Sequence, residues 1–203
     1  MLINPNKKRL YYYLICVFFF VLAGFFQMID SQLPEFWHAL TSLMAHVILI
    51  SLVAVWGISL IHRMVRNDLL SFFISIASMI LFFLIVRMIK YGLTEEIDTL
   101  SRYMWYSYFI PQCLIPPTLL LSSLSIENKK GNTVSKKWYL LYIPALILII
   151  LIFTNDLHQW VFKLNFENGN FSYEHNLLFY FTLVWEIILI LIRTFPEILL
   201  GYI

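Results

Sequence analysis

Hydrophobic residues along this chain gather into long runs that are separated by short polar stretches. Six such runs stand out: Leu10–Met28, Phe36–Ile61, Leu69–Tyr91, Tyr103–Ile126, Trp138–Thr154 and Leu177–Ile192. A helix needs about 20 mostly apolar residues to cross the roughly 30 Å hydrocarbon core of a bilayer. The runs lack the period-two alternation of barrel strands. The pattern therefore predicts an all-α, polytopic membrane bundle of six transmembrane helices, forming one transmembrane domain over residues 1–203.

The composition agrees with this prediction. The chain is 61% hydrophobic and only 13% charged, whereas soluble domains carry about 25% charged residues. A formal net charge of +2 is too small to suggest a nucleic-acid partner. Both cysteines, Cys16 and Cys113, fall inside apolar runs, so no disulfide framework or metal-binding cysteine spacing is expected.

The basic residues are distributed unequally between the two sides that six alternating helices would create. One side holds ten of them: Lys7, Lys8, Arg9, Arg63, Arg66, Lys129, Lys130, Lys136, Lys137 and Arg193. The other side holds the remaining four, Arg87, Lys90, Arg102 and Lys163, together with most acidic residues. The positive-inside rule then predicts a multi-pass protein with its N-terminus and the end of its sixth helix in the cytoplasm. We expect the first run to be an uncleaved helix, because no small-x-small cleavage site follows it.

The stretch Phe153–Phe162, FTNDLHQWVF, ends the fifth run and brings several polar side chains together within six residues. Asp156 and His158 could form an acid/base or ligand-binding pair beside the aromatic Trp160. The simpler interpretation is a helix end anchored at the membrane surface, because Asn and Asp disfavour helix interiors and Trp prefers the interface. Further along, the tract FENGNFSYEHN is typical of a turn or hairpin tip on the outer surface.

The fourth run is the most unusual. It opens with a cation and an aromatic belt, Arg102, Trp105 and Tyr106 among them, and then places prolines within the membrane. A proline removes a backbone donor and clashes with the preceding turn, so we expect a kink or break. The polar residue and the prolines that could form a hinge are Pro111, Gln112, Pro116 and Pro117. The alternative is a packing irregularity without function.

Ionisable side chains within the apolar runs also need an explanation, because each costs at least about 2.5 kcal/mol at the bilayer centre. His46 lies near the middle of the second run and Glu186 near the middle of the sixth. A neutral His46 could make an ordinary helix–helix hydrogen bond or act as a sensor. Glu186 is expected to be protonated, paired or facing a wet cavity. Arg87 and Lys90 can reach the interface, where Glu95 and Glu96 predict a solvated charge cluster.

Motifs of soluble enzymes and nucleotide-binding proteins are absent from the sequence. It contains no P-loop, no Gly-rich dinucleotide motif, no HExxH and no nucleophile elbow. We therefore expect no catalytic residues, no cofactor and no metal site in this chain.

Two stretches together resemble a known family. The first is Arg102-Tyr103-x-Trp105-Tyr106-x-Tyr108-Phe109-Ile110-Pro111, followed by Ile115-Pro116; the second leads from Tyr142-Ile143-Pro144 to Thr154-Asn155-Asp156-Leu157-His158-Gln159. Both are similar to the N-terminal seven-transmembrane sensor region of bacterial histidine kinases, over roughly Phe72 to Ile192. The resemblance implies a sensor of a two-component system in a bacterial cell membrane. It also implies a cytoplasmic kinase or other output domain and a homodimer.

The chain departs from that family pattern at both ends. The run Leu10–Met28 is an extra N-terminal helix, and no kinase phosphorylation helix or ATP-binding domain follows the sixth run. The family's helix count implies two further helices and an output domain after this sequence. We therefore expect the sequence to be a truncated gene product or a fragment.

These observations lead to a hypothesis and two alternatives. In the hypothesis an outer vestibule binds a small extracellular ligand and relays its presence through the proline hinge and the sixth helix. The vestibule residues are Arg102, Trp105, Tyr106, Asp156, His158 and Trp160. In the first alternative the chain is a small transporter or channel-like subunit whose polar path joins His46, Gln112 and Glu186. In the second it is a structural membrane subunit, and neither cluster forms.

Overall fold

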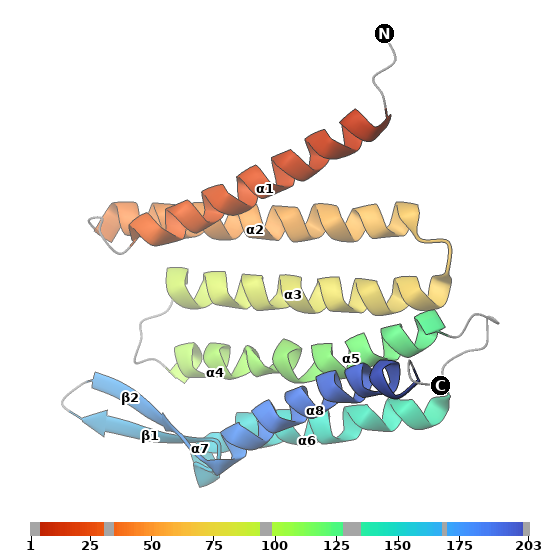
Figure 1. The fold of residues 1–203 in the computed structure, drawn as a ribbon. Coiled ribbons are helices and arrows are strands. Elements are labelled where there is room, and N and C mark those ends of the chain that lie inside the picture. Colours follow the sequence, from red (N-terminus) through yellow and green to blue (C-terminus); the bar gives the residue numbers. More distant parts are fainter. Residues whose placement is uncertain (1–4, 31–34, 94–98, 128–134, 168–169, 201–203) are drawn as a thin grey trace.

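A computed structural model describes residues 5–30, 35–93, 99–127, 135–167 and 170–200. The elements of the first half are α1 (Pro5–Asp30), α2 (Glu35–Arg63), α3 (Asn67–Leu93), α4 (Thr99–Ser107) and α5 (Phe109–Glu127). Those of the second half are a 3₁₀ helix η1 (Lys136–Leu141), α6 (Tyr142–Phe153), α7 (Asn155–His158), β1 (Phe162–Glu167), β2 (Asn170–His175) and α8 (Leu177–Leu200). The long helices lie side by side and alternate in direction (Figure 1).

The prediction of membrane-length apolar helices is confirmed. Within the described residues, five segments are long and apolar enough to cross a membrane: Tyr11–Met28, Leu40–Arg63, Asn67–Tyr91, Thr99–Ile126 and Lys136–Phe153. A shorter apolar segment, Leu177–Ile192, belongs to α8. Lipid offers no hydrogen-bond partner to the backbone, so a helix, which satisfies its own N–H and C=O groups, is the stable form for such runs.

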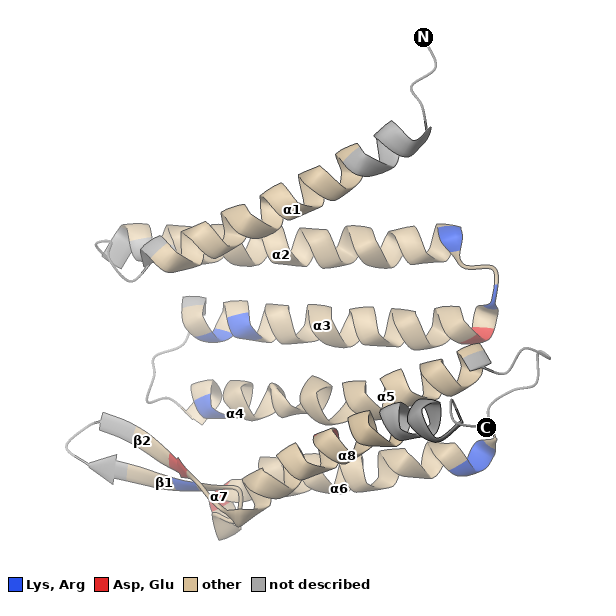
Figure 2. Ribbon diagram, in the orientation of Figure 1, with Lys and Arg blue, Asp and Glu red and all other residues tan. Residues whose placement is uncertain are grey.

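The helices pack in an order that follows the chain. α2 packs against α1 and α3, and α3 packs against α5, which also contacts α6 and α8. The end of α1, the start of α2, the end of α3 and the start of α4 lie at one end of the bundle, together with α7 and the hairpin (Figure 1). The end of α2, the start of α3, the end of α5 and η1 lie at the other end. Lys and Arg residues lie at both ends of the bundle, and the middle of the described helices is nearly free of charged residues (Figure 2).

The predicted helix Tyr103–Ile126 is two helices. α4 and α5 are separated at Tyr108, whose N–H donates to the Trp105 carbonyl at 3.1 Å in a tighter turn. Pro111 explains the position, because its ring clashes with the carbonyl four residues earlier and its missing N–H costs nothing in the first turn of α5. The sequence predicted a break but did not place it, and α5 continues as a helix through Pro116 and Pro117.

The predicted helix Trp138–Thr154 also changes character near a proline. It begins as the 3₁₀ helix η1 and becomes the α-helix α6 at Tyr142, two residues before Pro144. As at Pro111, the proline occupies the first turn of the α-helix, where its missing N–H would have had no helical partner.

The helix predicted to end at Thr154 ends at Phe153, and Asn155–His158 then forms one separate helical turn, α7, which the sequence did not predict. Gln159 ends that turn in the left-handed conformation, with φ of 53°. The chain then forms an antiparallel hairpin in which Phe162 pairs with His175 and Glu167 pairs with Asn170. The expectation of a hairpin tip in this tract agrees with that pairing. The fold is therefore a helical bundle with a two-stranded hairpin added at one end.

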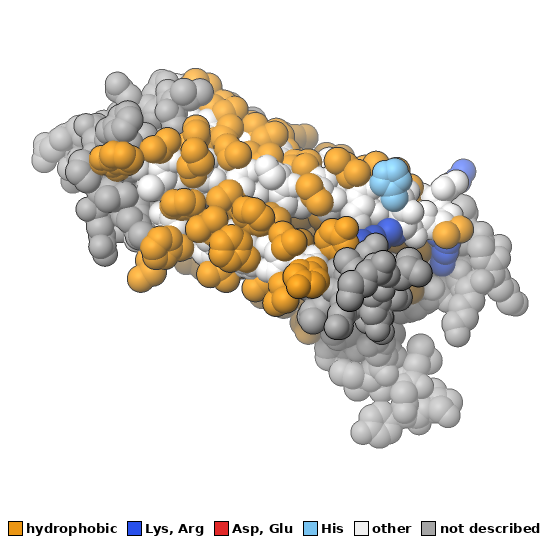
Figure 3. Space-filling view, turned by 90° about the horizontal axis from the view of Figure 1, so that it is seen from above, with side chains coloured by type: hydrophobic (Ala, Val, Ile, Leu, Met, Phe, Trp, Pro, Cys, Tyr) orange, Lys and Arg blue, Asp and Glu red, His pale blue; other side chains and the backbone are white. Residues whose placement is uncertain are grey.

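A cluster of buried hydrophobic residues lies beside this hairpin. It contains Tyr106 and Phe109 near the α4–α5 break, Cys113 of α5, Ala145 and Ile152 of α6, and Val161 and Phe162 at the start of β1. By contrast, α1 covers only one side of α2, and Ala23 is its buried residue among those whose side chains are described. Viewed from above, hydrophobic side chains cover much of the described surface over α1 and α2 (Figure 3).

Candidate functional site

An ion pair joins α4 to the turn that follows α6. The Arg102 Nη2 atom lies 2.9 Å from the Asp156 Oδ2 atom, and the two side chains are 19% and 24% exposed. The other carboxylate oxygen, Oδ1, accepts a hydrogen bond from the Tyr106 hydroxyl at 2.7 Å. Arg102 and Tyr106 stand four residues apart on α4, so they occupy the same helix face. The structure thus brings together three of the six residues predicted for the vestibule.

Asn155 organises the backbone beneath this ion pair. Its Oδ1 accepts hydrogen bonds from the N–H groups of Val161 at 2.9 Å and Phe162 at 3.0 Å. Its Nδ2 donates to the Phe162 carbonyl at 2.9 Å and to the Tyr106 hydroxyl at 3.3 Å. The side chain is completely buried. One amide therefore fixes the start of β1 relative to α4 and α7, and hence the position of Asp156.

An aromatic layer packs on the inner side of the polar cluster. The Trp105 ring centroid lies 4.4 Å from that of Phe162 and 4.5 Å from that of Tyr173, and Tyr106 is stacked on Phe162. His175 stacks on Phe179 with centroids 3.9 Å apart. Trp105, the fourth predicted vestibule residue, is thus a packing residue between α4 and the hairpin.

His158 and Trp160 lie nearby but make different contacts from those expected. The Trp160 N–H donates to His158 Nδ1 at 3.0 Å, so Nδ1 is the acceptor and a neutral ring carries its proton on Nε2. Nε2 lies 3.2 Å from the Thr154 hydroxyl. The two rings pack on each other with centroids 4.7 Å apart, and Trp160 is 58% exposed. These contacts close the α7 turn, and the contacts found for His158 and Trp160 do not include Asp156.

Sequence reasoning did not single out Asn176, which links the hairpin to α8. Its N–H donates to the Val161 carbonyl at 2.9 Å, and its Nδ2 donates to the Gln159 carbonyl at 2.9 Å. Its Oδ1 accepts from the N–H of Leu177, the first residue of α8. An Asn immediately before an apolar run is a helix-start signal, so this role was available from the sequence.

The three residues of the predicted polar path do not form one cluster. His46 lies on α2, where its Nδ1 is 2.7 Å from the Ser42 carbonyl of its own helix. Gln112 on α5 and Glu186 on α8 lie close enough for their side chains to interact. Since α2 packs against α1 and α3 while α5 packs against α8, the helices that carry His46 and Glu186 belong to different parts of the bundle.

The predicted charge cluster at the end of α3 can be described only in part. The Arg87 guanidinium lies 5.8 Å from the centre of the Tyr91 ring, and the Lys90 ammonium lies 4.7 Å from it. Both cations therefore have an aromatic contact on their own helix. Glu95 and Glu96 lie outside the described residues.

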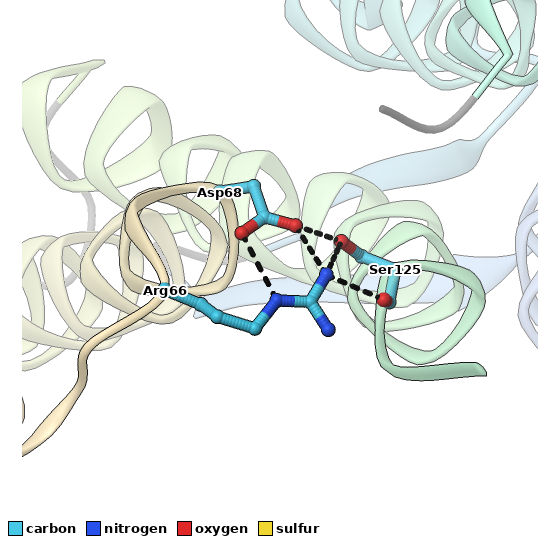
Figure 4. A network of polar contacts seen from close by, with 3 residues as sticks. All are labelled: Arg66, Asp68 and Ser125. Atoms are coloured by element: carbon cyan, nitrogen blue, oxygen red, sulfur yellow. Dashed lines mark hydrogen bonds and ion pairs between the residues drawn. The ribbon is translucent and has the colours of Figure 1, made fainter. Parts of the chain in front are cut away.

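A second polar network, which the sequence did not predict, lies at the opposite end of the bundle, where α3 begins and α5 ends (Figure 1). Figure 4 shows its three residues, Arg66, Asp68 and Ser125. Arg66 donates to both carboxylate oxygens of Asp68, at 3.3 Å and 2.7 Å, and to the Ser125 carbonyl at 2.8 Å. The Ser125 hydroxyl donates to the same carboxylate. Arg66 and Asp68 flank the start of α3, whereas Ser125 lies near the end of α5. The network therefore joins these two helices by charge-assisted hydrogen bonds.

Among the described residues, no group of three or more His, Cys, Asp or Glu side chains is placed to hold a metal ion. Comparisons of the chain with protein-family models, with curated proteins and with solved structures find no match.

Proposed function

We propose that this chain is the sensor module of a bacterial signal-transduction receptor of the histidine-kinase type. It lies in the cell membrane with its N-terminus in the cytoplasm, and its hairpin end faces outward. The observation that supports this proposal most directly is the Arg102–Asp156–Tyr106 cluster. It consists of two opposite charges, each about one-fifth exposed, at the end of the bundle that carries the hairpin. A small polar ligand that engages either charge would compete with the existing ion pair.

The contacts around the cluster suggest how such competition would be relayed. α4 is separated from α5 by the break at Tyr108, so α4 can change its tilt without bending α5. Asp156 connects α4 to the α7 turn, and Asn176 connects that turn to the start of α8. α8 packs against α5 along its path to the other end of the bundle. A shift at Arg102 would thus reach a cytoplasmic output domain through α8, as a change in the populations of two packing states.

The test is a reporter experiment in bacteria, with the chain joined at its C-terminus to a histidine-kinase output domain that drives a promoter. We expect Arg102→Gln and Asp156→Asn each to change the basal output several-fold. The double variant should differ from the sum of the two, because the residues act through one contact. Lys163→Gln, which removes an exposed cation from β1 at the same end, is the matched control. The proposal would be refuted if Arg102→Gln, Asp156→Asn and the double variant all kept the wild-type basal output at equal membrane abundance.

The transporter alternative has one supporting observation, the contact between Gln112 and Glu186. Its third residue, His46, lies on a helix that packs elsewhere, so the polar path it requires is incomplete. Proteoliposomes containing the wild-type chain and Glu186→Gln would decide between the two. A cation or solute flux that is present in the wild type and absent in the variant would favour transport over sensing.

A further inference from the structure

The groove between α1 and α2 is a described feature that the proposed function leaves unused. Its volume is about 890 Å³. It is lined by Tyr12, Tyr13 and Cys16 of α1 and by Leu52, Val55, Trp56, Ser59 and Arg63 of α2. The two helices are close where they connect and diverge toward the N-terminus of α1 (Figure 1). The groove therefore widens toward the end of the bundle where Arg63 lies.

The lining changes from apolar to polar along the groove. On α2 the lining residues nearer the middle of the helix are the apolar Leu52, Val55 and Trp56. The polar Ser59 and Arg63 follow toward the C-terminal end of α2. From Leu52 to Arg63 an α-helix rises about 16 Å, at 1.5 Å per residue. One leaflet contributes about half of the roughly 30 Å hydrocarbon core. The groove thus has the length of one leaflet, with its cation at the depth of the lipid headgroups.

The charge at the mouth is positive. Arg63 is exposed, and the sequence places Lys7, Lys8 and Arg9 in the early part of α1, just before Tyr12. The nearby carboxylate of Asp68 is paired with Arg66 and therefore does not neutralise Arg63. Basic pockets between transmembrane helices on the cytoplasmic side are typical sites for anionic lipid headgroups.

We propose that the α1–α2 groove binds an anionic phospholipid of the cytoplasmic leaflet, with its acyl chains along Leu52–Trp56 and its phosphate at Arg63. A second copy of the chain is a poorer occupant. A symmetric pair formed about an axis along the membrane normal would place the two basic ends together, and like charges in contact cost several kcal/mol. This proposal does not depend on what the Arg102–Asp156–Tyr106 cluster binds. The choice of the cytoplasmic leaflet rests on the orientation given under the proposed function.

The test measures lipid retention by the purified full chain in native mass spectrometry. The probe is an equimolar mixture of phosphatidylglycerol and phosphatidylcholine with identical acyl chains. We expect the wild type to retain phosphatidylglycerol preferentially, and Arg63→Gln to lower that preference about fivefold, the effect of one basic residue near an anionic surface. Lys137→Gln removes an exposed cation at the same end outside the groove and should leave the preference unchanged. Free glycerol phosphate, which lacks the chains, should not displace the bound lipid.

A second variant tests the apolar part of the groove. Ser59→Trp fills it and should reduce the retention of both lipids, with circular dichroism verifying that the bundle is still helical. If Ser59→Trp fails to fold, Arg63→Gln still decides the matter. Equal retention of the two lipids by the wild type, a preference unaltered in Arg63→Gln, or a lipid-free dimer would overturn the proposal.

Discussion

Asn155 fixes the geometry of the bundle end that carries the hairpin. Its single amide serves two backbone donors, one backbone carbonyl and the Tyr106 hydroxyl while completely buried. Asp156, the adjacent residue, makes the contacts that a ligand would compete with. The residue that positions the site and the residue that offers its charge are therefore neighbours in sequence with different surroundings.

Replacing Asn155 should consequently destabilise the protein strongly. Asn155→Ala leaves the N–H groups of Val161 and Phe162 buried without an acceptor, and each such group costs about 1–3 kcal/mol. We expect the free energy of unfolding in detergent to fall by about 2–4 kcal/mol, measured by thermal or denaturant unfolding. Asn165→Ala, a half-buried position in the same hairpin, should change it by less than about 1 kcal/mol. Similar losses in the two variants would contradict the role assigned to Asn155.

The sequence predicted which residues meet at this site only as far as topology determines it. Arg102 and Asp156 both follow from the rule that alternate connections lie on the same side, so their proximity could be anticipated. The direction of a side chain could not. His158 stands two residues after Asp156 in a tight turn, and its ring turns toward Trp160 and Thr154. Which of two neighbouring polar residues faces the partner depends on backbone angles that residue type does not reveal.

At the level of helices and turns, each proline-associated change in helical structure lies up to one turn before the proline itself. The break at Tyr108 lies three residues before Pro111, and the change from η1 to α6 lies just before Pro144. Pro116 and Pro117 lie inside α5 without ending it, because neighbouring helices can supply the missing contacts within a membrane bundle. The sequence thus predicted a break in this segment but not its position. The position depends on which proline occupies the first turn of a helix.

Gln159, which ends the α7 turn, is the one non-glycine residue with a positive φ among the described residues, at 53°. The left-handed conformation costs an L-residue roughly 1–2 kcal/mol, and glycine avoids this cost. Gln159→Gly should therefore raise the free energy of unfolding by up to about 1 kcal/mol, whereas Gln159→Val should lower it by at least about 1 kcal/mol. Chemical denaturation of the two variants in detergent checks both signs. A valine variant as stable as the glycine variant would refute the assignment of the turn.

The Arg66–Asp68–Ser125 network should hold the ends of α3 and α5 together. Arg66 also donates to the Ser125 carbonyl, one of the last carbonyls of α5, which lacks a donor within its own helix. Asp68→Asn and Ser125→Ala should each lower the free energy of unfolding by about 1 kcal/mol and accelerate amide exchange in the last turn of α5. Ser75→Ala removes a hydroxyl that bonds only to its own helix, at Ser71, and is the control. Exchange in α5 that is the same in all four proteins would argue against the network.

For the whole molecule, long apolar runs were sufficient to predict the helices, because lipid leaves the backbone no better alternative. Their lateral arrangement was not predictable. Apolar residues surround the helix in the run Leu10–Met28. The sequence therefore did not indicate which face of α1, the one with Ala23, would pack against α2. Where lipid and protein are equally apolar, hydrophobicity carries little information about which face packs.

The orientation across the membrane is the last prediction, and labelling can test it directly. In a chain carrying Cys16→Ser and Cys113→Ser, a single cysteine is introduced at Ser172, exposed on β2, or at Ser135, exposed just before η1. With the basic connections in the cytoplasm, a membrane-impermeant maleimide added to intact cells should label Ser172→Cys and spare Ser135→Cys. Inside-out vesicles should give the reverse pattern. If Ser135→Cys reacts in intact cells and Ser172→Cys does not, the hairpin faces the cytoplasm. The Arg102–Asp156 cluster would then lie on the wrong side to meet an extracellular ligand.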